Sequence, residues 1–223
     1  IIALRSPRPG PAVWVLTGIH GEEPAGPNAV AAVIEELAAL GERMPVVLLP
    51  LCNPQGYARN WRYLNTPTFS ETVEGQSVGD SSHLLPEPAD PERPRAAAAS
   101  SPEAAALTTY VLRTAASYPP VVSIDLHEDD LLAAGYVYSQ GELGAADPLA
   151  TAAVAVLGEH GIPIQRAGTT RFDEPIAGGI IGPVTDSSID ELMSAREVLV
   201  DGTLRPGPSA RTVLVFETPA AEL

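Results

Sequence analysis

Two of the four histidines in the chain directly follow apolar segments that predict buried strands. His20 comes after residues 12–19, and His127 comes after residues 121–126. In an open α/β sheet the carboxyl ends of the strands border the ligand crevice, so we expect the two imidazoles to meet there. Neutral imidazole is the commonest zinc ligand, and a catalytic zinc takes three protein ligands plus water. Glu23, three residues after His20, is a natural third ligand. The alternative is that His20 only caps a strand.

A metal-activated water also needs a carboxylate that takes its proton. The candidates are Glu22, Asp125, Glu128 and Glu217. Strand alternation puts Asp125 on the same side as His127, where it could orient the imidazole. Glu217 ends an apolar segment without other charges, and a buried glutamate is costly there unless it is paired or belongs to a site. The alternative is that the segment has reached solvent at this residue.

Arginines follow a third apolar segment, at residues 46–52. Arg59 and Arg62 lie just beyond it and are two of only 13 basic residues in the chain. A guanidinium at this position could stabilise a developing oxyanion. The alternative is an ion pair with one of the 28 acidic residues, which is the commoner role of an arginine.

Composition limits the classes of partner. The net charge is −15, and all of the basic residues are Arg. Because a protein that follows phosphates needs clustered cations, nucleic acid and anionic membrane surfaces are not expected as partners. The single cysteine excludes an internal disulfide, and no apolar run approaches the roughly 18 residues of a membrane helix. No signal-peptide pattern opens the chain, which slightly favours a cytoplasmic location, and the oligomeric state stays open.

Strand and helix patterns alternate along the chain. Strands are predicted at residues 12–19, 46–52, 121–126, 136–139 and 212–216. Helices are predicted at residues 27–40, 101–118, 147–160 and 192–199, the last behind a capping pattern at 187–190. The Pro- or Gly-rich segments 66–101 and 169–185 predict long loops. This alternation predicts an α/β sandwich with a mostly parallel sheet, and the length fits a single domain over residues 1–223.

Five short motifs stand in the order in which a known family has them. They are His20-x-x-Glu23, Asn53-Pro54-x-Gly56, Trp61-Arg62, Asp125-Leu126-His127 and Phe216-Glu217. This series resembles the zinc carboxypeptidases of the carboxypeptidase A type, including their succinylglutamate desuccinylase and aspartoacylase relatives. The resemblance implies a three-layer sandwich, in which a mixed, mostly parallel sheet of about eight strands lies between helices.

The resemblance also implies a role for individual residues. His20, Glu23 and His127 would bind one zinc ion per chain. Arg62 would polarise the scissile carbonyl, and Glu217 would act as general base and acid. The implied substrate is a peptide or an N-acyl amino acid.

One motif departs from the family pattern. The family's Asp-x-Asn-Arg, whose last two residues hold the substrate carboxylate, has its best counterpart at Asp80, Ser82 and His83. Asp80 would orient His20, while Ser82 and His83 would bind substrate. A histidine can donate to a carboxylate but lacks the rigid fork of an arginine. Arg171 in the Gly-rich segment is an alternative cation.

The sequence therefore predicts a zinc-dependent, metallocarboxypeptidase-like hydrolase that cleaves a peptide or amide bond through a metal-activated water. An N-acyl-amino-acid deacylase of the desuccinylase and aspartoacylase type is the alternative enzyme. A third interpretation is a non-catalytic, zinc-binding relative.

Overall fold

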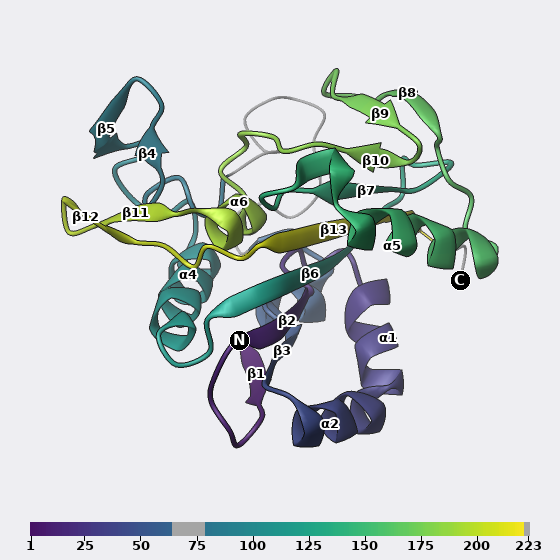
Figure 1. Cartoon of the computed structure of the whole chain (residues 1–223), viewed down its shortest axis with the longest axis horizontal. Coiled ribbons are helices and arrows are strands. Elements are labelled where there is room, and N and C mark those ends of the chain that lie inside the picture. The colour runs from purple at the N-terminus through teal and green to yellow at the C-terminus, as the bar shows by residue number, and fades with distance from the viewer. Residues whose placement is uncertain (64–78, 221–223) are drawn as a thin grey trace.

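A nine-stranded sheet forms the centre of the computed structural model, which describes residues 1–63 and 79–220 (Figure 1). In spatial order its strands are β1 (Ile2–Arg5), β3 (Val46–Leu51), β2 (Ala12–Thr17), β6 (Pro120–Asp129), β13 (Thr212–Pro219), β7 (Tyr136–Ser139), β10 (Ile180–Ile181), β9 (Pro175–Ala177) and β8 (Ala167–Thr169). The four strands β3, β2, β6 and β13 run parallel to one another. Antiparallel partners flank them, so the sheet is mixed, as predicted.

The predicted apolar segments form the middle of this sheet because they can be buried on both faces. β7 agrees with the prediction at both ends. β6 and β13 continue beyond their predicted ends, since they pair in parallel register as far as Pro219 opposite Asp129. Glu217 consequently lies inside β13, directly opposite His127, and not beyond the end of the strand.

Helices and two small hairpins complete the fold. The helices are α1 (Ala25–Ala32), α2 (Ile34–Arg43), α3 (Pro54–Arg59), α4 (Pro102–Ala115), α5 (Pro148–Glu159) and α6 (Ile189–Ser194), with a 3-10 turn at Gly144–Ala146. The hairpins are β4 (Pro86–Glu87) with β5 (Asp90–Pro94), and β11 (Glu197–Val200) with β12 (Thr203–Pro206). The predicted helix at 27–40 is two helices, because the backbone of Val33 leaves the helical region with φ −117° and ψ 25°.

The predicted helix at residues 192–199 is wrong. Ser188, and not Ser187, caps α6, which ends at Ser194 before the chain enters β11. β11 turns back through Asp201 and Gly202, whose φ angles of 53° and 70° suit a two-residue hairpin turn. The predicted loop at 169–185 is also partly wrong, because it contributes the strands β9 and β10 to the edge of the sheet.

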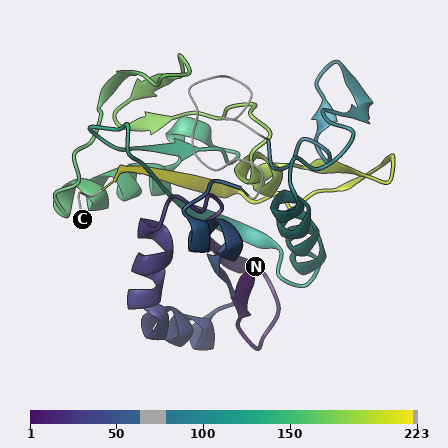
Figure 2. The ribbon, with the colours of Figure 1, turned by 180° about the vertical axis from the view of Figure 1, so that it is seen from behind.

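The sheet separates two layers of helices, as Figures 1 and 2 show from opposite sides. On one face Trp14 and Leu16 of β2 pack with α4 and α6 in the largest core cluster. On the other face Val15 packs with α1 and α2, and Leu214 packs with α5. Neighbouring residues of one strand thus enter different layers, and the predicted three-layer α/β sandwich is confirmed.

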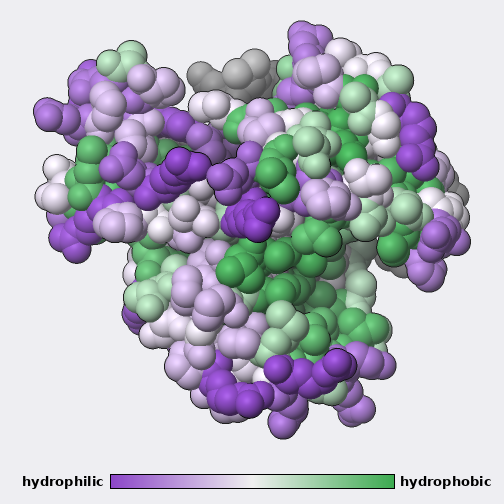
Figure 3. Space-filling model, in the orientation of Figure 1, coloured by the Kyte–Doolittle hydropathy of each residue, from purple (hydrophilic) through white to green (hydrophobic). Residues whose placement is uncertain are grey.

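The outer surface is mixed in hydropathy. Hydrophilic residues gather over α2 and over the β11–β12 hairpin, and hydrophobic residues gather between α1 and α5 on the same face (Figure 3). Among the exposed apolar side chains are Val33, Leu149 and Val156, at 44%, 45% and 50% exposure. Within the described residues, no helix has the length and apolar character that crossing a bilayer requires.

We expect Leu192→Ala to lower the free energy of unfolding by roughly 2–5 kcal/mol, because Leu192 is fully buried between α6 and the sheet. Urea unfolding followed by circular dichroism measures this change. Leu204→Ala, at a leucine that is 40% exposed on β12, is the control and should change stability by less than about 0.5 kcal/mol. Equal effects of both substitutions would contradict this packing.

Candidate metal centre and active site

The pairing of β2 with β6 brings His20 and His127 together. These strands are parallel neighbours, with Thr17 opposite Leu126 at their carboxyl ends. His20 lies in the turn that follows β2, and His127 lies within β6. The two imidazole rings have their centroids 4.9 Å apart. The structure therefore brings together the two histidines that the sequence predicts at one place.

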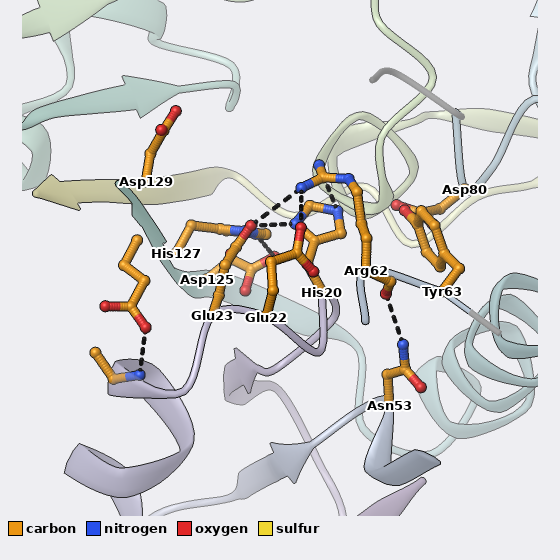
Figure 4. A network of polar contacts seen from close by, with 12 residues as sticks. His20, Glu22, Glu23, Asn53, Arg62, Tyr63, Asp80, Asp125, His127 and Asp129 are labelled. Carbon is orange, nitrogen blue, oxygen red and sulfur yellow. Dashed lines mark hydrogen bonds and ion pairs between the residues drawn. The ribbon is translucent and has the colours of Figure 1, made fainter. Parts of the chain in front are cut away.

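Glu23 lies between these two imidazoles (Figure 4). Its Oε1 is 2.7 Å from Nδ1 of His20, and its Oε2 is 2.6 Å from Nδ1 of His127. The ligand atoms of the three residues all lie within 4.8 Å of one another. Burial raises the pKa of the Glu23 carboxyl, but the two histidines outweigh it and hold that pKa well below its usual value. Glu23 is thus a buried carboxylate that contacts one ring nitrogen of each histidine.

The two imidazoles have opposite electrostatic environments. Burial, helped by Arg62, lowers the pKa of His20 to about 4. Burial also acts to lower the pKa of His127, but Asp125 and Glu23 outweigh it, so that this pKa lies well above its ordinary value. The Oδ2 atom of Asp125 is 3.1 Å from Nε2 of His127. Asp125 thereby orients the ring with Nδ1 towards Glu23, as strand alternation predicts.

Arg62 lies against the same cluster. Its Nη1 donates to Glu22 over 3.0 Å and to Glu23 over 3.3 Å, and its Nη2 is 3.0 Å from Nε2 of His20. The other arginine that the sequence singles out, Arg59, has its guanidinium over the ring of Trp61.

The Asn-Pro-x-Gly segment holds the backbone of Arg62. The side chain of Asn53 caps α3 by accepting a hydrogen bond from Gly56 N, and its Nδ2 donates to Arg62 O over 2.8 Å. The amide of Gly21 donates to the same carbonyl oxygen over 3.2 Å. A Cβ at Gly21 would lie inside van der Waals contact with the backbone of Gly56 and Trp61. Close packing of two loops therefore sets the position of Arg62 relative to the His20 turn.

Glu217 faces the cluster from β13. It is opposite His127 in the strand register and lines the adjoining cavity. Burial raises the pKa of its carboxyl to about 8, although His127 acts to lower it. A carboxyl of this kind can hold a proton near neutral pH and release it.

Two cavities meet at this cluster. The first has a volume of about 330 Å³ and extends towards α6, and the second has a volume of about 420 Å³ and extends towards α1. The residues that line both cavities are His20, Arg62, Arg171 and Glu217. Nη1 of Arg171 is 2.6 Å from Oδ2 of Asp129. A substrate could therefore lie across the cluster with one part in each cavity.

Asp80 reaches the first cavity but contacts Tyr63 and not, as predicted, His20. Asp80 lines the first cavity, but its Oδ1 accepts a hydrogen bond from the hydroxyl of Tyr63 over 2.8 Å. Tyr63 in turn meets the ring of His20 edge-on, at 5.6 Å between centroids. The predicted contact of Asp80 with His20 is thus replaced, within the described residues, by a contact through Tyr63.

The two residues predicted to hold the substrate carboxylate, Ser82 and His83, do not line the cavities, and His83 faces α4. Nε2 of His83 is 3.4 Å from the hydroxyl of Thr108 on α4, and neither Ser82 nor His83 is among the described residues that line the two cavities. The tight turn in which Leu84 N donates to Ser81 O directs this segment towards α4. Residues 66–78 of the loop predicted at 66–101 lie outside the described residues, and its later part contains the β4–β5 hairpin.

The sequence patterns do not predict three acidic residues of the first cavity, which are Glu174, Asp186 and Asp190. Asp186 and Asp190 lie at the start of α6 and line the cavity wall. The Ser-x-x-Asp pattern predicts a helix cap at this place, and a cap gives no reason for a buried carboxyl. Tyr63 is missed in the same way, since nothing in its sequence position predicts its contact with Asp80.

Comparison with known proteins places these residues in a recognisable fold. The family model for the succinylglutamate desuccinylase/aspartoacylase catalytic domain matches residues 9–79, which include the His20 turn and Arg62. A metallopeptidase candidate from Shewanella baltica is similar over 99% of this chain and 74% of its own, with 26% identity and a TM-score of 0.73. The succinylglutamate desuccinylase of Chromobacterium violaceum covers 99% of this chain with a TM-score of 0.56, and its 17% identity shows a common fold alone.

A curated relative is a probable carboxypeptidase 2 from Trichophyton verrucosum. It is 41% identical over 61 residues, which are 24% of this chain and 12% of the relative's length. Sequence similarity thus covers part of the chain, whereas similarity of fold covers nearly all of it. The chain shares its fold with a metallo-carboxypeptidase from Burkholderia cenocepacia and with the desuccinylase. Its resemblance to carboxypeptidases and to the desuccinylase and aspartoacylase branch, which the motifs predict, is confirmed.

We expect Gly21→Ala to destabilise the protein by about 1–3 kcal/mol and to weaken any binding of a metal ion by the His20, Glu23 and His127 cluster, because its Cβ would push the His20 turn away from the Arg62 loop. Thermal unfolding and zinc titration with a competing chelator measure the two effects. Gly182→Ala is the control, since a Cβ there meets no atom within 4 Å. Zinc affinity equal to that of the unsubstituted protein would contradict this account of the turn.

Proposed function

We propose that this protein is a zinc-dependent, metallocarboxypeptidase-like hydrolase that cleaves a peptide or amide bond. One observation supports this most: the ligand atoms of His20, Glu23 and His127 converge within 4.8 Å, with Glu217 opposite His127 in the strand register. Arg62 completes the arrangement on the other side of Glu23.

The donor set fits zinc. Two imidazole nitrogens and one carboxylate are the three protein ligands of many catalytic zinc sites. Both Nδ1 atoms face Glu23, and Asp125 holds the far nitrogen of His127, which is the support that metal-binding histidines usually have. When bound, zinc supplies a Lewis acid that polarises a carbonyl and lowers the pKa of a water from 15.7 to about 7.

Arg62 is suited to stabilise negative charge on the substrate oxygen. Its guanidinium lies where the two cavities meet, and its side chain is only 12% exposed. A cation that is already in place and shielded from water stabilises a developing oxyanion without reorganisation during the reaction.

Glu217 is suited to move the proton. Glu217 is partly buried, faces the cluster and lines both cavities. It would take a proton from the attacking water and pass it to the leaving amine. The raised pKa, near 8, favours the second part of this transfer, because the protonated form is then accessible near neutral pH.

A second candidate function is the release of an amino acid from an N-acyl group. The match of residues 9–79 to the desuccinylase/aspartoacylase catalytic domain favours it. Both reactions would use His20, Glu23, His127 and Glu217, and they differ in the part of the substrate that binds in the two cavities. Hydrolysis of a peptide with a free carboxyl end supports the first function, and hydrolysis of N-acetyl or N-succinyl amino acids alone supports the second.

We expect Glu217→Gln to reduce turnover by a factor on the order of 10²–10⁴ while the zinc content stays at one ion per chain, since Glu217 moves the proton and is not a metal ligand. Hydrolysis of a panel of benzoylglycyl peptides and N-acyl amino acids, with zinc measured by atomic emission, tests this. Glu142→Gln, at a surface carboxylate with a 59% exposed side chain, is the control. Unchanged turnover in Glu217→Gln would exclude the proposed role, and a protein without zinc-dependent hydrolysis would be a non-catalytic relative.

A further inference from the structure

One face of the central strand β6 carries apolar side chains that the fold leaves partly uncovered. Val122, Ile124 and Leu126 are partly exposed, whereas Ser123 and Asp125, which point to the other face, are fully buried. A central parallel strand is normally covered on both faces, so the usual order of burial is reversed here. This face of β6 therefore lacks part of its cover within the described residues.

The neighbouring strand β2 extends this surface. In the parallel register Val13 and Val15 lie opposite Val122 and Ile124. Both are partly exposed, whereas Trp14 between them is fully buried in the opposite layer. On the uncovered side α1 packs on β2 and β6, α5 packs on β7 and β10, and hydrophobic residues gather between the two helices (Figure 3). We name this surface the α1–α5 face: its floor consists of Val13, Val15, Val122, Ile124 and Leu126, and the outer sides of α1 and α5 border it.

Helix α5 is apolar on its outer side as well as on its inner side. The inner residues are buried against the sheet, while Leu149 and Val156 on the outer side are exposed. From Pro148 to Gly158 the helix contains no charged residue. A helix that is apolar all round is typical of a buried position, so the outer side of α5 has the composition of a contact surface.

Helix α1 has the same character, and α2 does not. Residues 25–34 contain no charged residue, and Val33 at the end of α1 is exposed. The next helix, α2, carries Glu35, Glu36 and Glu42 at exposed positions, which is the pattern of a helix that faces water. The chain thus places charges on the solvated helix α2 and leaves the borders of the α1–α5 face without them.

A second copy of this chain fits the α1–α5 face. The net charge is −15, so two copies repel each other where acidic surfaces meet, and this face offers a contact without that repulsion. A two-fold contact uses the same surface of both molecules, so the surface must be complementary to itself. Each copy has both parts that are needed: an uncovered apolar floor, and an apolar outer helix side that can cover the floor of the other copy.

The size of the face also suits such a contact. The exposed residues of α1 and α5, taken with the floor, approach the roughly 20–30 residues that each partner contributes to a standard interface. An anionic membrane surface fits less well, because it would repel an acidic molecule.

We propose that the protein forms a two-fold dimer through the α1–α5 face, with α5 of each copy packed against the floor of the other. The floor residues lie on the face of β6 opposite to Asp125, which serves His127. The dimer is therefore an interaction surface beyond the proposed function and does not depend on it.

Sedimentation equilibrium over a wide range of protein concentration tests the proposal. We expect twice the mass of the chain at high concentration. Leu149→Glu and Val156→Arg should each raise the dissociation constant at least roughly tenfold, because each puts a charge into an apolar contact. They change the net charge in opposite directions, so a shared effect cannot come from overall charge. Both suit α5, since an acid is favourable in the first turn of a helix and a cation in the last.

Leu4→Glu on β1 and Leu204→Arg on β12 are the matched controls. Both leucines are exposed and lie outside the α1–α5 face, so neither substitution should change the dissociation constant. Thermal unfolding of all four variants checks that each is folded.

Thiol labelling locates the contact by a second measurement. Ala152 is exposed on α5, and the single cysteine of the chain, Cys52, is buried. In the Ala152→Cys variant the introduced thiol should react with a maleimide more slowly as the protein concentration rises, because the second copy covers it. In Leu204→Cys the rate should not depend on protein concentration.

Three results would overturn the proposal. The protein could stay a monomer at every concentration, and binding of that monomer to phosphatidylcholine vesicles would assign the face to a lipid surface. A dimer could survive both α5 substitutions with its dissociation constant unchanged. Leu4→Glu could instead be the substitution that dissociates the dimer, which would place the contact at the edge strand β1.

Discussion

The contact of one carboxylate with two imidazoles is the interaction on which the site depends. Glu23 reaches Nδ1 of His20 and Nδ1 of His127 from a position that is 92% buried. A charged group so deep in the protein is stable only where opposite charge and hydrogen bonds compensate it. Glu23 therefore fixes where the turn after β2 and the end of β6 must meet.

Strand pairing and backbone hydrogen bonds hold the segments around Glu23 in place. Parallel pairing brings the carboxyl ends of β2 and β6 to one edge, and β13 adds Glu217 opposite His127. The loop after β3 reaches the same place because the amide of Gly21 and the side chain of Asn53 both bind the carbonyl oxygen of Arg62. The side chains that would act on a substrate are thus held by strands and by a capped helix.

Much of this arrangement could be predicted from residue order. The apolar segments locate the central strands, because strands buried on both faces need continuous runs of Val, Ile and Leu. A histidine or a glutamate next to such a segment predicts a functional site, because burying a polar group costs free energy unless it is paired or hydrogen-bonded. The helix caps are less informative. Ser188 and not Ser187 caps α6, and residues 197–199 of the predicted helix belong to β11, which pairs with β12 through the Asp201–Gly202 turn.

By itself, the sequence determined the α/β class, the central strands and the polar residues at their ends, because these depend on local patterns of apolar and charged residues. The meeting of His20 and His127 was also predictable, but only the tertiary structure decided which other residues lie beside them. It turns His83 towards Thr108, places Tyr63 between Asp80 and His20, and brings Asp190 of α6 to the wall of the first cavity. The physical reason is that such contacts join segments far apart in the chain, and their geometry follows from packing and strand register, which no local pattern specifies.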